Sequence, residues 1–193
     1  MIRLLSSKLA DFLCEKSIIP EEDKEIYIYG NELLISSFIG IALVCIVGVI
    51  LGEFLSALVF LVVFIINRQF SGGYHASTFI KCTLIFLCNF FVVLFMSKMM
   101  LQYYSPFVWI SLTVVHLAVI IDLAPMGNKN KPISPEKRIK GRKKIIVISL
   151  FFELLSGLMI FVDKNISINI ALTLLSISML MIFQKFNGGE NDG

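Results

Sequence analysis

Charged residues are scarce in this chain of 193 residues, because Asp, Glu, Lys and Arg together make up only 16% of it. Histidine occurs twice, tryptophan occurs once, and none of the four cysteines belongs to a CxxC pair. The shortage of charge excludes an ordinary water-soluble domain. The cysteine pattern favours neither a zinc site nor a disulfide framework. We therefore expect no metal, no other cofactor and no nucleic acid partner.

Apolar sequence is abundant instead: 57% of the residues are hydrophobic, and the mean hydropathy is +0.86. A membrane-spanning helix needs about 20 mostly apolar residues. We predict an all-α polytopic helix bundle with about six transmembrane helices, in a single membrane-embedded domain covering residues 1–193. The lipid bilayer is its expected surroundings. The six expected spans are residues 33–51, 54–66, 82–96, 107–121, 145–162 and 166–183.

The second run, residues 54–66, is short for a span, so a short crossing and a re-entrant element are both open. The positive-inside rule favours a crossing. If the N-terminus is cytoplasmic and all six runs cross, only Lys98 and Lys164 of the 17 Lys and Arg face outward. We therefore predict that both termini are cytoplasmic, together with a basic loop at residues 123–144.

The N-terminal segment, residues 1–32, is expected on the cytoplasmic side or at the membrane interface. Within it, Ile2, Leu5, Leu9 and Phe12 recur at helical spacing, which predicts an amphipathic helix. This helix either lies on the membrane surface or packs against the bundle, and the sequence leaves both open. At the other end of the chain, the polar tail at residues 187–193 is expected to be disordered.

A polar stretch, residues 68–82, separates the second and third apolar runs. It holds His75, Cys82 and the glycine pair Gly72 and Gly73. Glycines let the backbone turn sharply and approach a ligand closely. A thiol and an imidazole beside such a turn are the parts of a cysteine nucleophile and its base. A buried cysteine is commonly just a small apolar residue, so this pair of residues does not decide the question alone.

The start of the third helix affects how Cys82 could react. Ser77 and Thr78 are both suitable N-cap residues, and a helix that begins there puts Cys82 close to its first turn. A helix N-terminus and a neighbouring cation such as Lys81 both stabilise a thiolate. The sequence therefore favours a reactive Cys82 at the start of this helix.

His75 and Cys82 are seven residues apart, which constrains the backbone between them. A continuous helix would separate them by roughly 10 Å along its axis, whereas a base must lie within about 3 Å of its nucleophile or one water away. We predict that the helix begins after His75, and that Gly72 and Gly73 fold the imidazole back toward Cys82.

The order and spacing in this stretch resemble those of the AgrB (accessory gene regulator B) family, bacterial membrane cysteine endopeptidases that process the precursor of a cyclic peptide pheromone. The resemblance extends over nearly the whole chain, in its length, in its number of apolar runs and in a later segment with Ala124-Pro125 and Asn130-Lys131-Pro132. It implies that Cys82 is the nucleophile and His75 the base. The matching residues are Arg68, Gly72, Gly73, His75, Ala76 and Cys82.

The resemblance also implies a biological role. The expected partner is the precursor peptide, whose C-terminal part would be cleaved through a thioester acyl-enzyme, enabling closure of a thiolactone or lactone in quorum sensing. The expected location is the bacterial cell membrane, with the active site at the cytoplasmic face. Arg68, Gly72, Gly73 and Lys81 would support the site or the substrate. The oligomeric state is open, and a homodimer is compatible with so small a bundle.

Two ionisable residues, His116 and Glu153, lie inside apolar runs. Buried polar groups in membranes usually satisfy each other, so a structural His116–Glu153 pair is expected. The alternative function is a small peptide transporter in which these residues form a relay, and a third is a scaffold without chemistry. The role of Arg68 also has two readings, because it could hold a substrate carboxylate or anchor a helix end among lipid headgroups.

Overall fold

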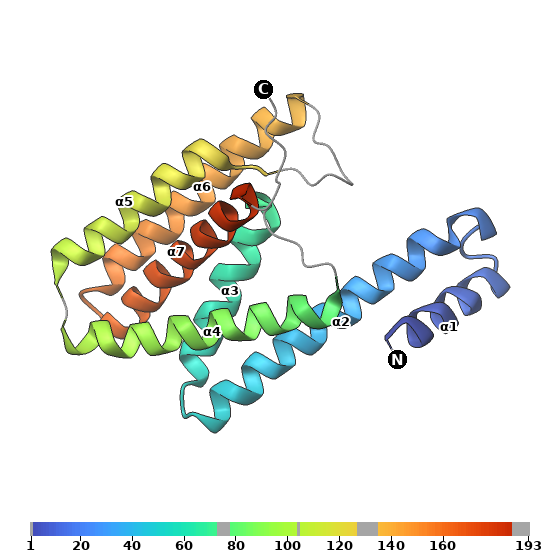
Figure 1. Cartoon of the computed structure of the whole chain (residues 1–193), viewed down its shortest axis with the longest axis horizontal. Helices are drawn as coiled ribbons and strands as arrows, with labels where there is room; N and C mark the ends of the chain where they lie inside the picture. Colours follow the sequence, from blue (N-terminus) through green and yellow to red (C-terminus); the bar gives the residue numbers. More distant parts are fainter. Residues whose placement is uncertain (1, 73–77, 104, 127–134, 187–193) are drawn as a thin grey trace.

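The computed structural model describes residues 2–72, 78–103, 105–126 and 135–186. These residues form seven α-helices and one short 3-10 helix, and they include no β-strand, so the predicted all-α fold is confirmed (Figure 1). The elements, in chain order, are α1 (Ile2–Glu15), η1 (Glu21–Asp23), α2 (Lys24–Ile50), α3 (Phe54–Ser71), α4 (Phe79–Gln102), α5 (Pro106–Leu123), α6 (Pro135–Met159) and α7 (Lys164–Phe186).

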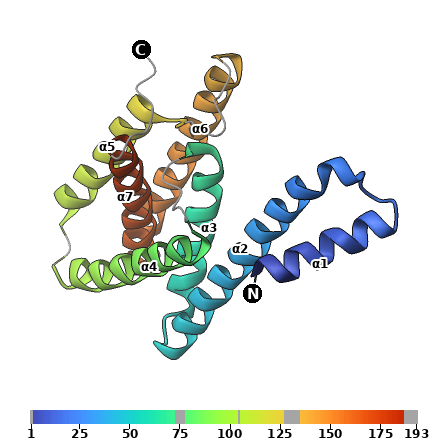
Figure 2. The same ribbon diagram turned by 45° about the vertical axis from the view of Figure 1, so that its right-hand side comes forward.

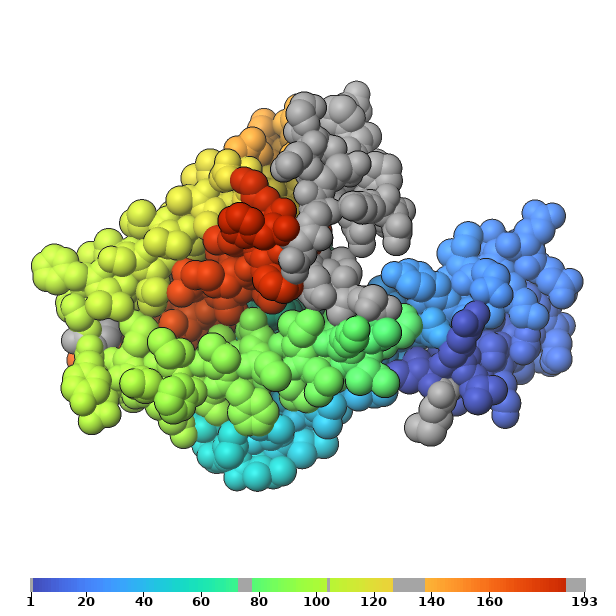
Figure 3. Space-filling view, in the orientation of Figure 1, coloured from blue at the N-terminus to red at the C-terminus, as the bar shows by residue number. Residues whose placement is uncertain are grey.

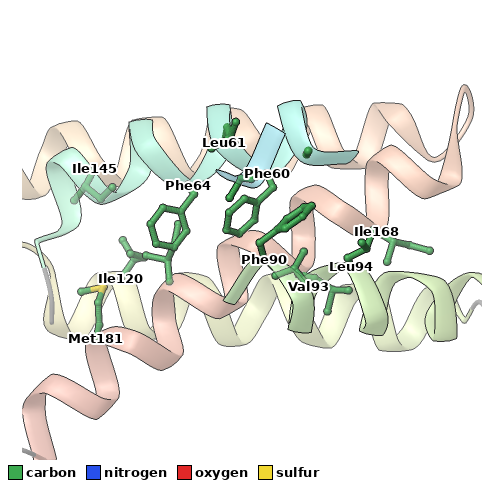
Figure 4. Close-up of a cluster of buried hydrophobic side chains, with 14 of the residues drawn as sticks. Phe60, Leu61, Phe64, Phe90, Val93, Leu94, Ile120, Ile145, Ile168 and Met181 are labelled. Carbon is green, nitrogen blue, oxygen red and sulfur yellow. The ribbon is translucent and has the colours of Figure 1, made fainter. Parts of the chain in front are cut away.

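The C-terminal helix α7 lies at the centre of the bundle, where it packs against α3, α4, α5 and α6. The main apolar core lies between these helices and includes a group of stacked and tilted aromatic rings on α3 and α4 (Figure 4). Phe60 lies 5.3 Å from Phe64 and 5.2 Å from Phe90, measured between ring centroids. The contact between Phe60 and Phe90 holds α3 against α4, the two helices that flank the turn of the motif at residues 68–82.

Five helices are long and apolar enough to cross a membrane, namely α2 with the short η1 before it, α3, α4, α5 and α7. The second expected span is longer than its apolar run, because α3 continues to Ser71 and has 18 residues. Helix α6 does not belong to the five. Its N-terminal part is strongly basic, and its apolar part carries Glu153. A sixth crossing, at α6, therefore stays a prediction.

The basic segment predicted as a loop at residues 123–144 is partly helical. Helix α5 extends to Leu123 and α6 begins at Pro135, so the basic residues from Arg138 to Lys144 lie on a helix. Proline is favoured in the first turn of a helix, and Lys and Arg are good helix formers. A high density of positive charge is therefore an argument about which side of the membrane a segment lies on, and it does not exclude a helix. Residues 127–134, which include Lys129, lie outside the described residues.

Polar contacts hold the turn between α2 and α3 and the turn between α6 and α7, at the end of the bundle away from the basic segment. The chain reverses at Gly52, and the Glu53 carboxylate then pairs with the Lys98 ammonium at 3.0 Å and accepts a hydrogen bond from the Ser56 hydroxyl at 2.9 Å. Partial burial alone would raise the pKa of Glu53, but the hydrogen bonds and the charge of Lys98 outweigh it and lower this pKa. Asp163 accepts hydrogen bonds from the backbone amides at the start of α7.

The predicted N-terminal helix is present as α1, which lies along the first half of α2. Ser6 and Ala10 are buried, and Asp11 pairs with Lys24 at 2.7 Å. The predicted apolar face points away from this contact, because Leu5 and Phe12 remain more than half exposed. Together, α1 and the first half of α2 project from the other helices (Figures 2 and 3). Helix α1 therefore packs on α2 while its apolar face stays available to a membrane.

Candidate active site

The first turn of α4 carries the candidate nucleophile. Thr78 has an extended backbone (φ −139°, ψ 148°), and its hydroxyl accepts a hydrogen bond from the Lys81 amide at 3.3 Å. The Cys82 amide donates to the Thr78 carbonyl at 3.0 Å. The helix begins at Phe79. The prediction of a helix that starts after His75 is therefore confirmed, and of the two predicted N-cap candidates, Ser77 and Thr78, the structure selects Thr78.

Cys82 combines an accessible thiol with a well-anchored backbone. Its thiol is free and the residue is exposed. The surrounding turns of α4 pack on α2, because the rings of Tyr29 and Phe79 lie 6.5 Å apart and the hydroxyls of Ser36 and Thr83 lie 3.5 Å apart. The structure thus fixes the helix start while Cys82 stays exposed among the described residues.

Arg68, on the last turn of α3, interacts with groups at both ends of the motif, the Gly72 carbonyl and Cys82. Its Nη1 donates a hydrogen bond to the Gly72 carbonyl at 2.8 Å, and the Ser71 hydroxyl donates to the same oxygen at 3.2 Å. The half-buried guanidinium also lies close enough to Cys82 to interact with it electrostatically. Lys81 is exposed beside Cys82. The site therefore combines one cation within electrostatic reach of the thiol with a second cation at the adjacent position in the sequence.

Gly72 ends α3 with a backbone conformation that favours glycine (φ +70°, ψ −152°). It forms a parallel bridge with Met126, whose amide donates to the Ser71 carbonyl at 2.9 Å. A Cβ atom at position 72 would overlap the Met126 carbonyl oxygen. Gly72 therefore supplies the sharp turn expected of it, and it also allows an approach to the backbone of Met126 that the sequence did not predict. Gly73 and His75 lie outside the described residues, and the folding back of the imidazole stays a prediction.

The expected pair between His116 and Glu153 does not form. The imidazole of His116 is fully buried, and its Nδ1 lies 2.8 Å from the Ser178 hydroxyl on α7. Among the described residues, neither the Nε2 atom of His116 nor the Oε1 atom of Glu153 has a hydrogen-bond partner. The prediction that these two side chains satisfy each other is wrong in this structure.

The register of α5 against α6 explains this difference. The Trp109 indole on α5 donates to the Ser156 hydroxyl on α6 at 3.0 Å. Because the two helices are antiparallel, this contact places Thr113 near Glu153, and both residues line the same surface groove. His116 lies about one helical turn farther along α5. His116 therefore lies beyond the level of Glu153, and its side chain faces the polar side of α7.

The profile of the accessory gene regulator B family, AgrB, matches residues 6–185. The chain belongs to the AgrB family. Similar proteins are AgrB-like proteins of Clostridium perfringens strains SM101 and 13, each 36% identical over 81% of this chain and 77% of the relative. A second such protein of strain 13 is 28% identical over 96% of this chain and 97% of its own. No solved structure matches the chain.

Membership in the AgrB family places the chain in the accessory gene regulator system of quorum sensing and links it to peptide processing. The matched region contains every residue of the candidate site. It also contains two residues that the sequence did not connect to the site, Ser71 and Met126. The signal that could have found them is Gly72, since a glycine pair before a reactive residue indicates that another part of the backbone approaches closely.

Replacing Ser178 by alanine is expected to destabilise this AgrB-family protein without impairing its chemistry. The change removes the hydroxyl that lies 2.8 Å from Nδ1 of the buried His116. Hydrogen bonds between helices in membranes contribute about 0.6 kcal/mol and up to about 1.7 kcal/mol. Thermal unfolding in detergent should therefore begin a few degrees lower. Ser176→Ala is the matched control, because the Ser176 hydroxyl donates only to a carbonyl of its own helix. Equal unfolding temperatures for the two variants would contradict this role of Ser178.

Proposed function

We propose that this AgrB-family protein is a membrane cysteine endopeptidase that cleaves a pheromone precursor, with Cys82 as nucleophile and His75 as base. The observation that carries the proposal is the exposed Cys82 thiol in the first turn of α4, with the Arg68 guanidinium nearby. A helix N-terminus and neighbouring cations stabilise a thiolate. Family membership links such a site to peptide processing.

In the proposed first step, the Cys82 thiol gives its proton to His75, and the thiolate attacks the carbonyl carbon of the scissile peptide bond. A carbon–sulfur bond forms and the carbon–nitrogen bond breaks, and His75 returns the proton to the leaving amine. The N-terminal part of the precursor stays on Cys82 as a thioester, and the C-terminal part is released.

In the proposed second step, a thiol or hydroxyl within the bound precursor attacks the thioester. This attack closes a thiolactone or lactone and restores the Cys82 thiol. Exchange of one thioester for another is nearly isoenergetic, so the energy of the acyl link is kept. A site with limited water at the membrane favours this intramolecular transfer over hydrolysis.

Backbone amides at the start of α4 are the candidate donors to the oxyanion of the tetrahedral intermediate. The first amides of a helix have no partner within the helix. Here the amides of Lys81 and Cys82 are bonded to Thr78. The amides of Phe79 and Ile80 therefore fit the role of an oxyanion hole.

The distribution of basic residues supports a cytoplasmic active site in the bacterial cell membrane. The positive-inside rule puts the start of α4 and the start of α6 on the same side. The basic residues from Arg138 to Lys144 lie on α6 and would attract an acidic segment of the precursor toward this face. The proposed partners are therefore the precursor peptide and the bilayer, with a second copy of the chain compatible with the exposed helices.

The second candidate function is a peptide transporter without proteolytic chemistry. It would rest on the two ionisable residues in the bundle, His116 and Glu153. The lack of a hydrogen bond between them weakens a relay, and the contact of His116 with Ser178 supports a structural role. The Cys82 site has no part in this function.

A cleavage assay in lipid nanodiscs separates the two functions, because a nanodisc supplies lipid but encloses no compartment. The purified protein is mixed with a tagged precursor peptide, and the fragments are identified by mass spectrometry. A peptidase is expected to release the C-terminal part of the precursor. An intact precursor in nanodiscs, combined with secretion of peptide by cells that express the chain, would contradict the peptidase and favour the transporter.

A further inference from the structure

The short segment Ala124–Met126, between α5 and α6, contacts the end of α3 through its main chain. The Met126 amide donates to the Ser71 carbonyl at 2.9 Å, and Met126 forms a parallel bridge with Gly72. These contacts join residues that are more than 50 positions apart in the sequence. They use backbone groups at the end of α3, directly before the part of the motif that lies outside the described residues.

The contact leaves no room at position 72. A Cβ atom there would overlap the carbonyl oxygen of Met126, and its next nearest neighbours would be the carbonyl carbon and the amide nitrogen of the same residue. All three are backbone atoms, so a side-chain rotation cannot relieve the overlap. Any residue larger than glycine must therefore push Met126 and the end of α3 apart.

The opposite side of the same segment packs against the start of α6. A Cβ atom at Gly141 would lie 3.2 Å from Cγ of Pro125. The guanidinium of Arg142 donates a hydrogen bond to the Ile121 carbonyl at the end of α5. The segment is thus fixed between α3 and α6 and does not depend on Gly72 alone for its position.

The Gly72 carbonyl connects this segment to the candidate active site. That oxygen accepts a hydrogen bond from Nη1 of Arg68 at 2.8 Å and another from the Ser71 hydroxyl at 3.2 Å. The same guanidinium lies within electrostatic reach of Cys82. The Gly72 carbonyl is therefore one of the groups that position the Arg68 cation relative to the thiol.

We propose that the Ala124–Met126 segment is a positioning element of the active site. By bonding to Ser71 and Gly72, its main chain sets the direction of the Gly72 carbonyl, which in turn helps to hold the Arg68 guanidinium within electrostatic reach of Cys82. Met126 and Gly72 act through Arg68 and need not touch the substrate. This inference rests on the proposed peptidase function, since its consequence is measured as cleavage of the precursor.

Two variants break the contact from opposite sides. Gly72→Ala introduces the overlapping Cβ, and Met126→Pro removes the amide that donates to Ser71. Gly52→Ala is the control for the first, because Gly52 also has a positive φ (+68°) but nothing lies within 4 Å of its added Cβ. Met126→Ala is the control for the second, because it changes the side chain and keeps the amide.

We expect Gly72→Ala and Met126→Pro to lower kcat for precursor cleavage by about 100-fold, the loss typical of a misplacement of about 1 Å near the chemistry. KM should stay within about threefold, since the precursor still binds. Both controls should cleave at nearly the wild-type rate. Thermal unfolding of all variants identifies any loss that comes from a smaller folded fraction.

A double-mutant cycle with Arg68→Gln tests the route of the effect. If the segment acts by holding Arg68, then Gly72→Ala combined with Arg68→Gln is no slower than the slower single variant. Losses that multiply, or wild-type cleavage by both Gly72→Ala and Met126→Pro, would overturn the inference. Failure of the peptidase function looks different, because in that case the wild-type protein does not cleave, or Cys82→Ala cleaves as well as wild type.

Discussion

Cys82→Ala is expected to abolish cleavage of the precursor, lowering its rate by at least about a thousandfold. Removal of a catalytic nucleophile typically costs this much or more, because the acyl-enzyme can no longer form. His75→Ala should cause a loss of the same kind by removing the base. The read-out is mass spectrometry of precursor fragments after co-expression, together with a search for a thioester adduct on Cys82 in the wild-type protein.

Cys88→Ala is the matched control for this experiment. Cys88 lies on the same helix, is also exposed and is also free, so it carries the same thiol as Cys82 but not at the first turn. We expect Cys88→Ala to cleave at the wild-type rate. Cleavage that survives Cys82→Ala would remove the peptidase proposal, and equal losses in both cysteine variants would show a general effect on folding.

The local part of the site was predictable from sequence. The N-cap at Thr78 follows from the capping preference of a hydroxyl side chain before an apolar run. The need for a break between His75 and Cys82 follows from the rise of an α-helix alone. Both depend on neighbours within one or two turns. The same is true of the glycine at position 72, whose positive φ agrees with the predicted turn.

The contacts between distant segments were not predictable in the same way. Met126 meets Gly72 because α5 ends beside α3, and nothing in the sequence near Met126 indicates that partner. His116 bonds to Ser178, and not to Glu153, because Trp109 and Ser156 fix the register of α5 against α6. A shift of one helical turn changes which residues face each other. Periodicity identifies the helices but does not determine this register.

Helix α6 shows a related limit of sequence reasoning. Its basic N-terminal part was expected to be a loop because positive charge indicates the cytoplasmic side of a membrane. That rule concerns location and not secondary structure. The helix begins at Pro135, well before the first apolar residue of the expected span at Ile145. Basic side chains at this end of the bundle are therefore fixed to a helix that also contacts Pro125 through Gly141.

Arg68→Gln is expected to lower the rate of cleavage by about 100-fold. Hydrogen bonds that involve an ionised group are stronger than neutral ones, so glutamine weakens the contact with the Gly72 carbonyl and removes the positive charge near Cys82. Arg68→Lys keeps the charge but lacks the planar fork of the guanidinium. If charge near the thiolate is the main contribution, Arg68→Lys should retain most of the activity that Arg68→Gln loses.

The rate of Cys82 alkylation separates this role of Arg68 from the two that the sequence left open. Alkylation by iodoacetamide needs no precursor, and it follows the thiolate and not the thiol. If Arg68 stabilises the thiolate, Arg68→Gln reacts more slowly than wild type. If Arg68 only holds a substrate carboxylate, Arg68→Gln leaves the alkylation rate unchanged and raises KM. An arginine that only anchors α3 among lipid headgroups leaves both unchanged, and the contact between Arg68 and Gly72 is the physical argument against that outcome.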